Sequence, residues 1–386
     1  MTVPDSTAVC AFLAESHVAL ATRVTEYAAR EIAPLPEPPD DKAARVQARE
    51  LLAQLGQAGW FTPIRDLDLR GACLVREALA AASPLADAVF ALQALGTVPI
   101  LLAGDRALKD RWVPAVLAGR AMASFALTEP EAGSDAAAIA TTARRDGAAY
   151  VLSGSKTFIS NAGVADFYTV FASTDPARGR KGISAFVVAA DAPGLTFVRP
   201  LVLSAPHPLG DIAFQDCRVP ASSRLGAEGE GFKLGLATLD RLRATVAAAA
   251  CGMATRALQE AVAHATRRRQ FGHTLGEFQL IQEKLARMAT DLTAARLLTY
   301  RAAWEKDRGA ERVTVEAAMA KAFATEAAQR IVDDAVQILG GRGVLASHPV
   351  DRLYRAVRAL RIYEGTTEIQ HLIVAGHLLK QAGGAA

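Results

Sequence analysis

The sequence predicts an α+β protein in which a central antiparallel β domain lies between two helical regions. Apolar residues recur at helical spacing up to about residue 120, alternate along short runs to residue 231, and then return to helical spacing. We therefore expect an N-terminal helical domain at residues 1–120, a central β domain at residues 121–231 and a C-terminal four-helix bundle at residues 232–386.

Each region has its own pattern. In the first, an apolar stripe at helical spacing contains Leu51, Leu52, Leu55 and Ala58. The uncharged run at residues 88–104 is shorter than a membrane span needs, and it predicts a buried helix followed by a turn. In the middle region, alternating runs start at Tyr150, Phe167, Ile183, Leu195 and Asp211. No long helical pattern separates them, so a βαβ series is excluded. The last region predicts helices at 239–264, 278–307, 315–339 and 367–380.

Composition excludes several classes of protein. Of 386 residues, 51% are hydrophobic and 22% charged, which is typical of a globular chain, and the net charge of +3 indicates no nucleic-acid surface. The four cysteines fit neither a disulfide framework nor a metal site, and His207, His264 and His273 lack ligand partners at useful spacing. The N-terminus lacks the features of a signal peptide. We expect a cytoplasmic protein without a metal, a nucleic-acid partner or a membrane partner.

Three segments carry residues suited to chemistry. Residues 125–135 form a polar loop at a domain junction, which fits a ligand site and an ordinary capped turn equally well. In residues 363–370, Thr367 and Gln370 fit a capping box, and Glu364 lies just before that helix. Glu364 is therefore either a general base, its pKa set by the helix dipole against burial, or a cap carboxylate. The arginines in residues 267–272 indicate a solvated face or a phosphate site.

These segments together resemble the acyl-CoA dehydrogenase family, the flavoenzymes that desaturate acyl thioesters. The resemblance covers nearly the whole chain. It is carried by Phe125-Ala-Leu-Thr-Glu-Pro-Glu-Ala-Gly-Ser-Asp, Gly154-Ser-Lys-Thr-Phe-Ile-Ser-Asn, Arg268-Arg-Gln-Phe-Gly, Glu277-Phe-Gln-Leu-Ile-Gln, Gln337-Ile-Leu-Gly-Gly and Arg361-Ile-Tyr-Glu-Gly-Thr-Thr-Glu-Ile-Gln. All six segments occur in the family's order.

The resemblance implies an acyl-CoA dehydrogenase-like fold with FAD between the β domain and the C-terminal bundle. By position, the flavin contacts would be Phe125, Leu127, Thr128, Gly133, Ser134, Phe158, Ser160, Thr366 and Glu368. A neighbouring subunit would complete the FAD site with Arg268, Phe271, Gln279, Gln337 and Gly341. The resemblance therefore also implies a homo-oligomer, either a homotetramer or a dimer.

The implied reaction is the α,β-dehydrogenation of an acyl-CoA thioester to the trans-2-enoyl-CoA. Glu364 matches the family's catalytic base, which removes the α-proton while flavin N5 accepts the β-hydride. Some relatives carry the base just before the arginine that matches Arg243, and here that place holds Leu242. The candidates for shaping the substrate site are Ser134, Asp240, Arg243, Tyr363 and Gly365. Electrons would pass to an electron-transferring flavoprotein.

The chain also departs from the family pattern. Residues 204–210 replace a stretch that usually contains Gly-x-Arg, which leaves the acyl group and its carrier open. The alternatives are an acyl-CoA oxidase, a dehydrogenase acting on a carrier-protein thioester, and a flavin-containing DNA-binding relative without dehydrogenase activity. The small net charge argues against the last of these.

Overall fold

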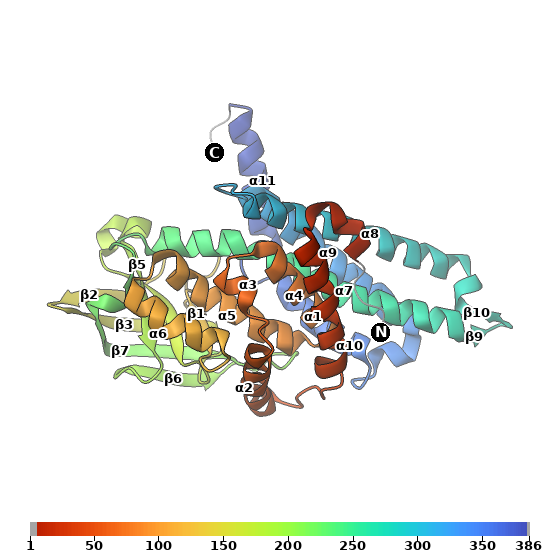
Figure 1. The fold of residues 1–386 in the computed structure, drawn as a ribbon, viewed down its shortest axis with the longest axis horizontal. Helices are drawn as coiled ribbons and strands as arrows, with labels where there is room; N and C mark the ends of the chain where they lie inside the picture. Colours follow the sequence, from red (N-terminus) through yellow and green to blue (C-terminus); the bar gives the residue numbers. More distant parts are fainter. Residues whose placement is uncertain (1–5, 384–386) are drawn as a thin grey trace. The chain divides into compact units, whose positions relative to one another are not determined.

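The computed structural model describes residues 6–383 (Figure 1). These residues form two compact units. The first unit contains residues 68–87 and the described parts of residues 1–36 and 240–386. The second contains residues 37–67 and 88–239. The three-domain division of the sequence stays a prediction.

The second unit is built on an eight-stranded sheet. Its strands are β1 (Ala123–Ala126), β2 (Thr142–Asp146), β3 (Ala149–Ser160), β4 (Phe167–Ser173), β5 (Ile183–Ala189), β6 (Leu195–Pro200), β7 (Leu209–Pro220) and β8 (Arg224–Leu225). The strand order is β6-β7-β3-β2-β4-β5-β8, with β1 beside β4. β4 pairs in parallel with β1 and β2, and the other pairs are antiparallel. The predicted β domain is therefore confirmed as mostly antiparallel.

Strand β4 is buried on both faces of this sheet, so its sequence is apolar along most of its length. Along β4, Phe167 and Phe171 join the core that contains Trp112, whereas Tyr168 and Val170 join the core on the other face. The helical elements of this unit are α2 (Asp41–Gln57), α3 (Thr62–Arg65), residues 88–103 of α5 (Pro84–Ala103), α6 (Arg106–Leu117), η3 (Pro176–Gly182), η4 (Ala221–Ser223) and residues 231–239 of α7 (Gly231–Arg267).

Helix α5 confirms the buried helix predicted near residues 88–104. It is long and apolar enough to cross a membrane, but 83% of its most apolar window is buried inside the protein. Gly96 lies so close to β1 that an added Cβ would be 2.7 Å from the Cβ of Ala123. The Oε1 atom of Gln93 accepts a hydrogen bond from the Ala123 N–H at 2.9 Å. These contacts are those of a core helix.

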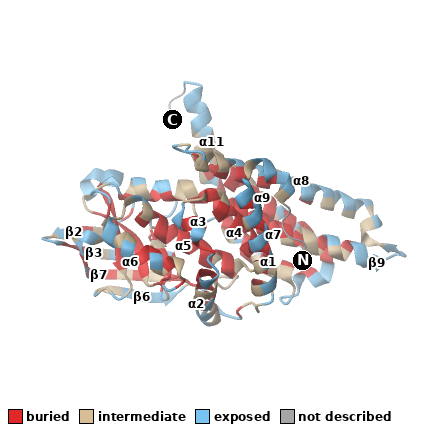
Figure 2. Cartoon of the chain, viewed as in Figure 1, coloured by how far each residue is buried: buried red, intermediate tan, exposed pale blue. Residues whose placement is uncertain are grey.

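The first unit is helical, and it confirms the four helices predicted in the C-terminal region. Its elements are η1 (Ser6–Phe12), α1 (Glu15–Tyr27), η2 (Ala28–Ile32), α4 (Leu69–Ala82), α7 (Gly231–Arg267, from residue 240), β9 (Arg269–Gln270), β10 (His273–Thr274), η5 (Leu275–Glu277), α8 (Gln279–Asp307), α9 (Thr314–Leu339), η6 (Gly340–Val344), α10 (Pro349–Leu360) and α11 (Thr367–Gln381). Helix α10 was missed, although its buried Val350, Leu353, Val357 and Leu360 follow helical spacing. Figure 2 shows buried residues concentrated in α4, α7 and α9.

Helices α4 and α7 approach closely because α7 has small residues at their contact. A Cβ added to Gly252 would lie 2.1 Å from the carbonyl oxygen of Glu77. We expect Gly252→Ala to lower the free energy of unfolding by about 1–3 kcal/mol, since a well-packed helix contact must separate to admit a methyl group. The measurement is the denaturant midpoint. Gly376→Ala is the control, because Gly376 of α11 has open space around it. An unchanged midpoint for Gly252→Ala would contradict this packing.

Candidate functional site

Glu364 and Gly365 form a turn between α10 and α11, and both have positive φ angles of 54° and 92°. Glycine adopts this conformation freely, whereas a glutamate must be held in it by its surroundings. The predicted capping box is wrong. The N-cap of α11 is Thr366, whose side chain accepts a hydrogen bond from the Ile369 N–H at 3.4 Å. The amide of Gln370 instead points back to this turn.

Three side chains hold the two carbonyl groups of the turn. The Glu364 carbonyl accepts hydrogen bonds from Arg243 Nε at 3.3 Å and from Gln370 Nε2 at 3.4 Å. The Gly365 carbonyl accepts from Lys321 Nζ at 2.6 Å and from Gln370 Nε2 at 2.9 Å. A Cβ on Gly365 would lie 2.6 Å from that amide nitrogen, so the turn requires a glycine at this position.

The surroundings of the Glu364 carboxyl group favour its protonated form. Its Oε2 atom is buried and has no hydrogen-bond partner among residues 6–383. Burial raises the pKa of Glu364, although the positive charges of Arg76, Lys321 and Arg243 oppose the increase. Burial is thus the largest influence on this pKa. A buried carboxylate with a raised pKa is better matched to proton transfer near neutral pH than an exposed one.

Two of the predicted substrate residues, Asp240 and Arg243, lie on α7 in the same unit as Glu364. Arg243 is 6% exposed, and its Nη1 atom lies 3.8 Å from Asp240 Oδ1. That Oδ1 atom is buried without a hydrogen bond within the described chain, as is Oε1 of Gln370. Buried acceptors of this kind require donors from a ligand or from water. Tyr363 is 42% exposed as a whole residue, but burial of its phenol group raises the pKa of that group.

Several of the predicted flavin contacts come together in the second unit. The Thr157 N–H donates to the Thr128 carbonyl at 3.1 Å, and Lys156 Nζ donates to the Leu127 carbonyl at 3.0 Å. These bonds place the segment after β1 beside β3. The predicted contacts on the two segments are Phe125, Leu127, Thr128, Phe158 and Ser160. The exposed Gly133 and Ser134 belong to the loop that follows β1.

Phe158 and Ser160 differ in their surroundings. Phe158 is 63% exposed and has a φ of 54°, so a large apolar ring is held in solvent by a strained backbone. The Ser160 hydroxyl is 2.8 Å from Nε2 of His207, and burial lowers the pKa of that histidine to about 4. Among residues 6–383, the Thr128 N–H has no acceptor. An exposed ring beside a free backbone donor fits a planar ligand that carries hydrogen-bond acceptors, such as a flavin.

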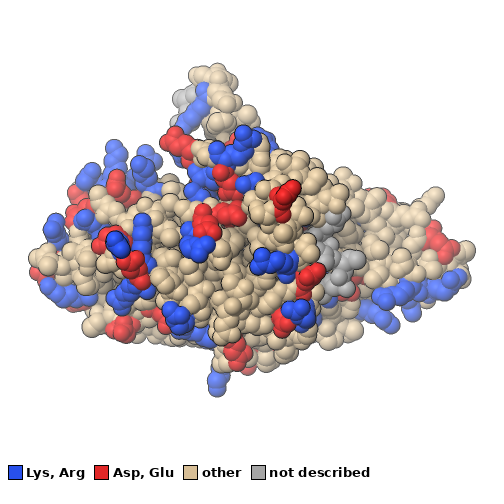
Figure 3. All heavy atoms as spheres, viewed as in Figure 1, with Lys and Arg blue, Asp and Glu red and all other residues tan. Residues whose placement is uncertain are grey.

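The remaining predicted flavin contacts lie in the first unit. Thr366 and Glu368 are at the start of α11, and Arg268 is one of the residues that line a basic groove of about 640 Å³. The groove is lined by Glu260, His264, Arg267, Arg268, Arg269, Leu339, Arg342 and His348. Burial lowers the pKa of both histidines, so the arginines carry its charge at neutral pH. Figure 3 shows basic side chains gathered near the β9–β10 end of this unit.

This groove has the donors that a pyrophosphate requires. Arg268 lines it, and the predicted contacts Gln337 and Gly341 flank its residues Leu339 and Arg342. Phe271, at the tip of the β9–β10 hairpin, is 91% exposed with a φ of 51°, and Gln279 begins α8. The residues present therefore fit the diphosphate part of FAD.

We expect Arg268→Ala to weaken FAD binding by about 10- to 100-fold, the value of one hydrogen bond to a charged group. The measurement is the flavin released on dilution, followed by its fluorescence. Arg312→Ala is the matched control, because Arg312 is an exposed arginine of the same unit outside the groove. Equal FAD affinities for the two variants would show that Arg268 makes no contact with the cofactor.

Sequence reasoning missed an ion pair that fixes the loop after β1. Lys156 is fully buried, and its Nζ atom donates to Glu129 Oε1 at 2.7 Å. Glu129 also accepts from the backbone N–H groups of Ala140 at 2.6 Å and Thr141 at 3.0 Å. Both charged residues stand inside family-like segments, so a search of those segments for opposite charges could have found the pair.

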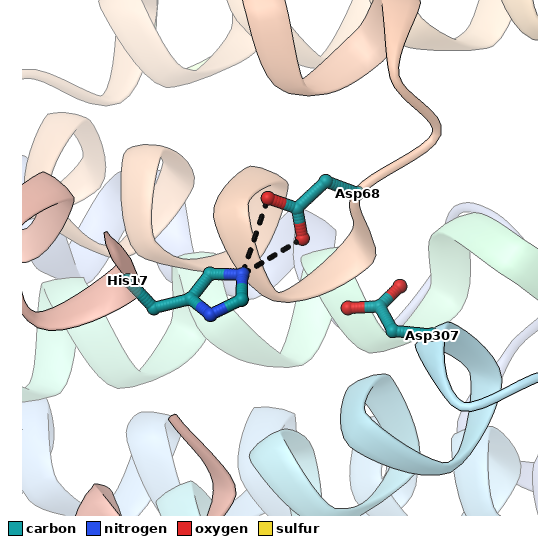
Figure 4. A group of neighbouring side chains, drawn as sticks. All are labelled: His17, Asp68 and Asp307. Carbon is teal, nitrogen blue, oxygen red and sulfur yellow. Dashed lines mark hydrogen bonds and ion pairs between the residues drawn. The ribbon is translucent and has the colours of Figure 1, made fainter. Parts of the chain in front are cut away.

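Within the described residues, one group of side chains has the composition of a metal site. His17, Asp68 and Asp307 place ligand atoms within 4.8 Å of one another (Figure 4). However, His17 Nδ1 accepts from the Ala14 N–H, so Nε2 carries the proton and donates to Asp68 at 3.1 Å. Asp307 accepts from the backbone N–H and Nε of Arg70. Donors already occupy these carboxylates, so we interpret the group as a clamp between α1, α4 and α8.

Comparison with known proteins gives consistent results along the chain. Three family models match it: "Acyl-CoA dehydrogenase, N-terminal domain" over residues 14–120, "middle domain" over residues 124–217 and "C-terminal domain" over residues 229–379. The mitochondrial short-chain specific acyl-CoA dehydrogenase of Bos taurus is 42% identical over 381 residues, which cover 95% of this chain and 91% of the relative.

Solved structures agree. The butyryl-CoA dehydrogenase of Megasphaera elsdenii has a TM-score of 0.89 at 36% identity, covering 95% of this chain and 99% of that one. A chain in the structure of the electron transferring flavoprotein of Acidaminococcus fermentans has a TM-score of 0.91 at 36% identity, with the same coverage.

Proposed function

The chain belongs to the acyl-CoA dehydrogenase family of FAD-dependent oxidoreductases, and we propose that it desaturates a short-chain acyl-CoA thioester. The names of the bovine relative and of the Megasphaera enzyme support this substrate class. Thioesters of carrier proteins remain the second candidate, because residues 204–210 depart from the family pattern.

The observation that carries the proposal is the buried, unpartnered Oε2 atom of Glu364. A carboxylate oxygen that is out of water and lacks a hydrogen bond is costly to the folded protein. It is useful where a proton must be taken from carbon, because no solvation shell has to be removed before the transfer. A purely structural cap carboxylate would instead bond to the N–H groups at the start of α11, and Thr366 fills that place.

The chemistry follows from two groups of the same residue. A thioester α-proton is weakly acidic and becomes removable when the carbonyl oxygen is polarised. Among residues 6–383, the backbone N–H of Glu364 has no acceptor, so it can donate to that oxygen. The side chain then takes the α-proton onto its carboxylate. Bound FAD supplies the two-electron acceptor for the β-hydride.

The experiment is a panel of acyl-CoA thioesters of increasing length and branching, mixed with the FAD-loaded protein without air. We expect the flavin absorbance to bleach most rapidly with short straight chains and the product to be the trans-2-enoyl thioester. Air is then admitted. Release of hydrogen peroxide would identify an oxidase, whereas re-oxidation only by electron-transferring flavoprotein supports a dehydrogenase. A panel that leaves the flavin oxidised would contradict the proposal.

We also propose that the protein is a homo-oligomer, most simply a homotetramer. Large apolar side chains of the first unit are strongly exposed: Phe271 at 91%, Leu280 at 80%, Leu372 at 67% and Val344 at 66%. Covering them against copies of the chain would remove this apolar surface from water. Light scattering on the purified protein gives the mass, and a monomer at micromolar concentration would contradict the assembly.

A further inference from the structure

Lys321 is a buried lysine beside the turn that carries Glu364. It lies in α9, is fully buried, and donates from Nζ to the Gly365 carbonyl at 2.6 Å. Within residues 6–383, no carboxylate forms an ion pair with it. A buried ammonium group without a paired carboxylate is costly, and burial lowers the pKa of Lys321 to about 8. An apolar side chain could fill this buried position without the cost of burying a charge.

Lys321 is placed where it can stabilise a strained turn. Glu364 and Gly365 both have positive φ angles, a conformation that a glutamate leaves unless its neighbours prevent it. Arg243 reaches only the first carbonyl of the turn, and Lys321 reaches only the second. Gln370 is hydrogen-bonded to both. The bond from Lys321 is the shortest of the four, and it comes from a helix outside the α10–α11 connection.

We propose that Lys321 is a positioning residue, whose ammonium group fixes the Gly365 carbonyl and thereby the turn from which the Glu364 carboxylate reaches the substrate. This inference rests on the proposed role of Glu364 as the base. Helix α9 would then contribute directly to the positioning of the base.

The charge of Lys321 has a second consequence. Arg76, Arg243 and Lys321 favour the ionised form of Glu364, whereas Asp87 opposes it. The charge of Glu364 also acts on the phenol group of Tyr363, and the charges of Glu326 and Glu368 act on Lys321. Removing Lys321 takes away one positive charge, so the pKa of Glu364 rises further. Only the deprotonated base accepts a proton. As the pH is lowered, the variant should therefore lose activity at a higher pH than the wild-type enzyme does.

The test compares Lys321→Met, which removes donor and charge, with Lys321→Gln, which keeps an amide donor without the charge. The readouts are the pH profile of kcat/KM with butyryl-CoA and the exchange of the α-proton into D₂O without an electron acceptor. For Lys321→Met we expect an acidic limb about one pH unit higher and α-proton exchange about tenfold slower at neutral pH, with KM little changed. For Lys321→Gln we expect the same shift of the limb but faster exchange than in Lys321→Met.

Lys284→Met is the matched control, because Lys284 pairs with Asp334 on the α8–α9 contact and does not contact the turn. Its pH profile should match wild type. A folded, FAD-loaded Lys321→Met or Lys321→Gln enzyme with the wild-type limb and exchange rate would overturn the proposal. If neither variant folds, the lysine is a stability residue and the proposal is likewise overturned. Exchange that persists in Glu364→Gln would instead refute the base assignment, so the two failures are distinguishable.

Discussion

The Glu364→Gln variant is expected to lose about 100- to 10,000-fold in kcat, the usual contribution of a general base. Glutamine keeps the size of the side chain and the backbone N–H of the turn, so flavin content and thioester binding should stay near wild type. The measurement is steady-state turnover of butyryl-CoA together with the dissociation constant of the thioester. The physical reason is that the variant loses the buried carboxylate oxygen Oε2, which is the proposed proton acceptor.

The control for this variant is Glu305→Gln, which changes a carboxylate on α8 that pairs with Arg301. It should keep wild-type turnover. Glu364→Asp provides a further comparison, because it retains the acid but shortens its reach, and we expect intermediate turnover. If Glu364→Gln turns over the thioester as fast as Glu305→Gln does, then Glu364 is not the base.

Asp87→Ala is expected to produce the largest loss of stability, about 3–5 kcal/mol, because it leaves a buried guanidinium group without its counter-ion. Arg76 and Asp87 have side chains 2% and 3% exposed and share two hydrogen bonds of 2.7 and 2.8 Å. Arg76 also donates to Thr245 Oγ1 on α7 at 2.9 Å. The measurement is the denaturant midpoint of the FAD-loaded protein.

Two comparisons make this result specific. Asp110→Ala removes one partner of an exposed pair, in which the side chains of Arg106 and Asp110 are 94% and 71% exposed, and no measurable change is expected. The double variant Arg76→Met with Asp87→Leu removes both charges and should recover most of the stability. A loss in the double variant as large as that in Asp87→Ala would contradict the uncompensated charge as the cause.

Much of the fold could be predicted because its signals are local. The short apolar run of β4 and the helical spacing along α8 and α9 each lie within one segment of sequence, and the structure confirms the strand and the two helices predicted there. The parallel pairing of β4 with β1 and β2 could not be predicted, since strand direction depends on the path of the connections. Helix α10 was missed although its apolar spacing was visible.

The candidate site shows the same division. Glu364 could be chosen because it stands within a short family-like segment next to a helix start. The residues that support Glu364 could not be predicted, because they are distant from the turn in sequence. Lys321 is 44 residues from Gly365, and Arg243 is 121 residues from Glu364. The capping error had a local cause, since Thr366 and Thr367 are adjacent and both suit an N-cap.

The central claim is that this chain, loaded with FAD, oxidises an acyl-CoA thioester with Glu364 as its base. The most direct measurement is an anaerobic titration of the FAD-loaded protein with butyryl-CoA, in which the flavin absorbance and the mass of the thioester are followed together. The account predicts bleaching in step with the formation of butenoyl-CoA in the wild-type protein and neither change in Glu364→Gln. A wild-type flavin that stays oxidised, or a Glu364→Gln protein that bleaches at the wild-type rate, would contradict it.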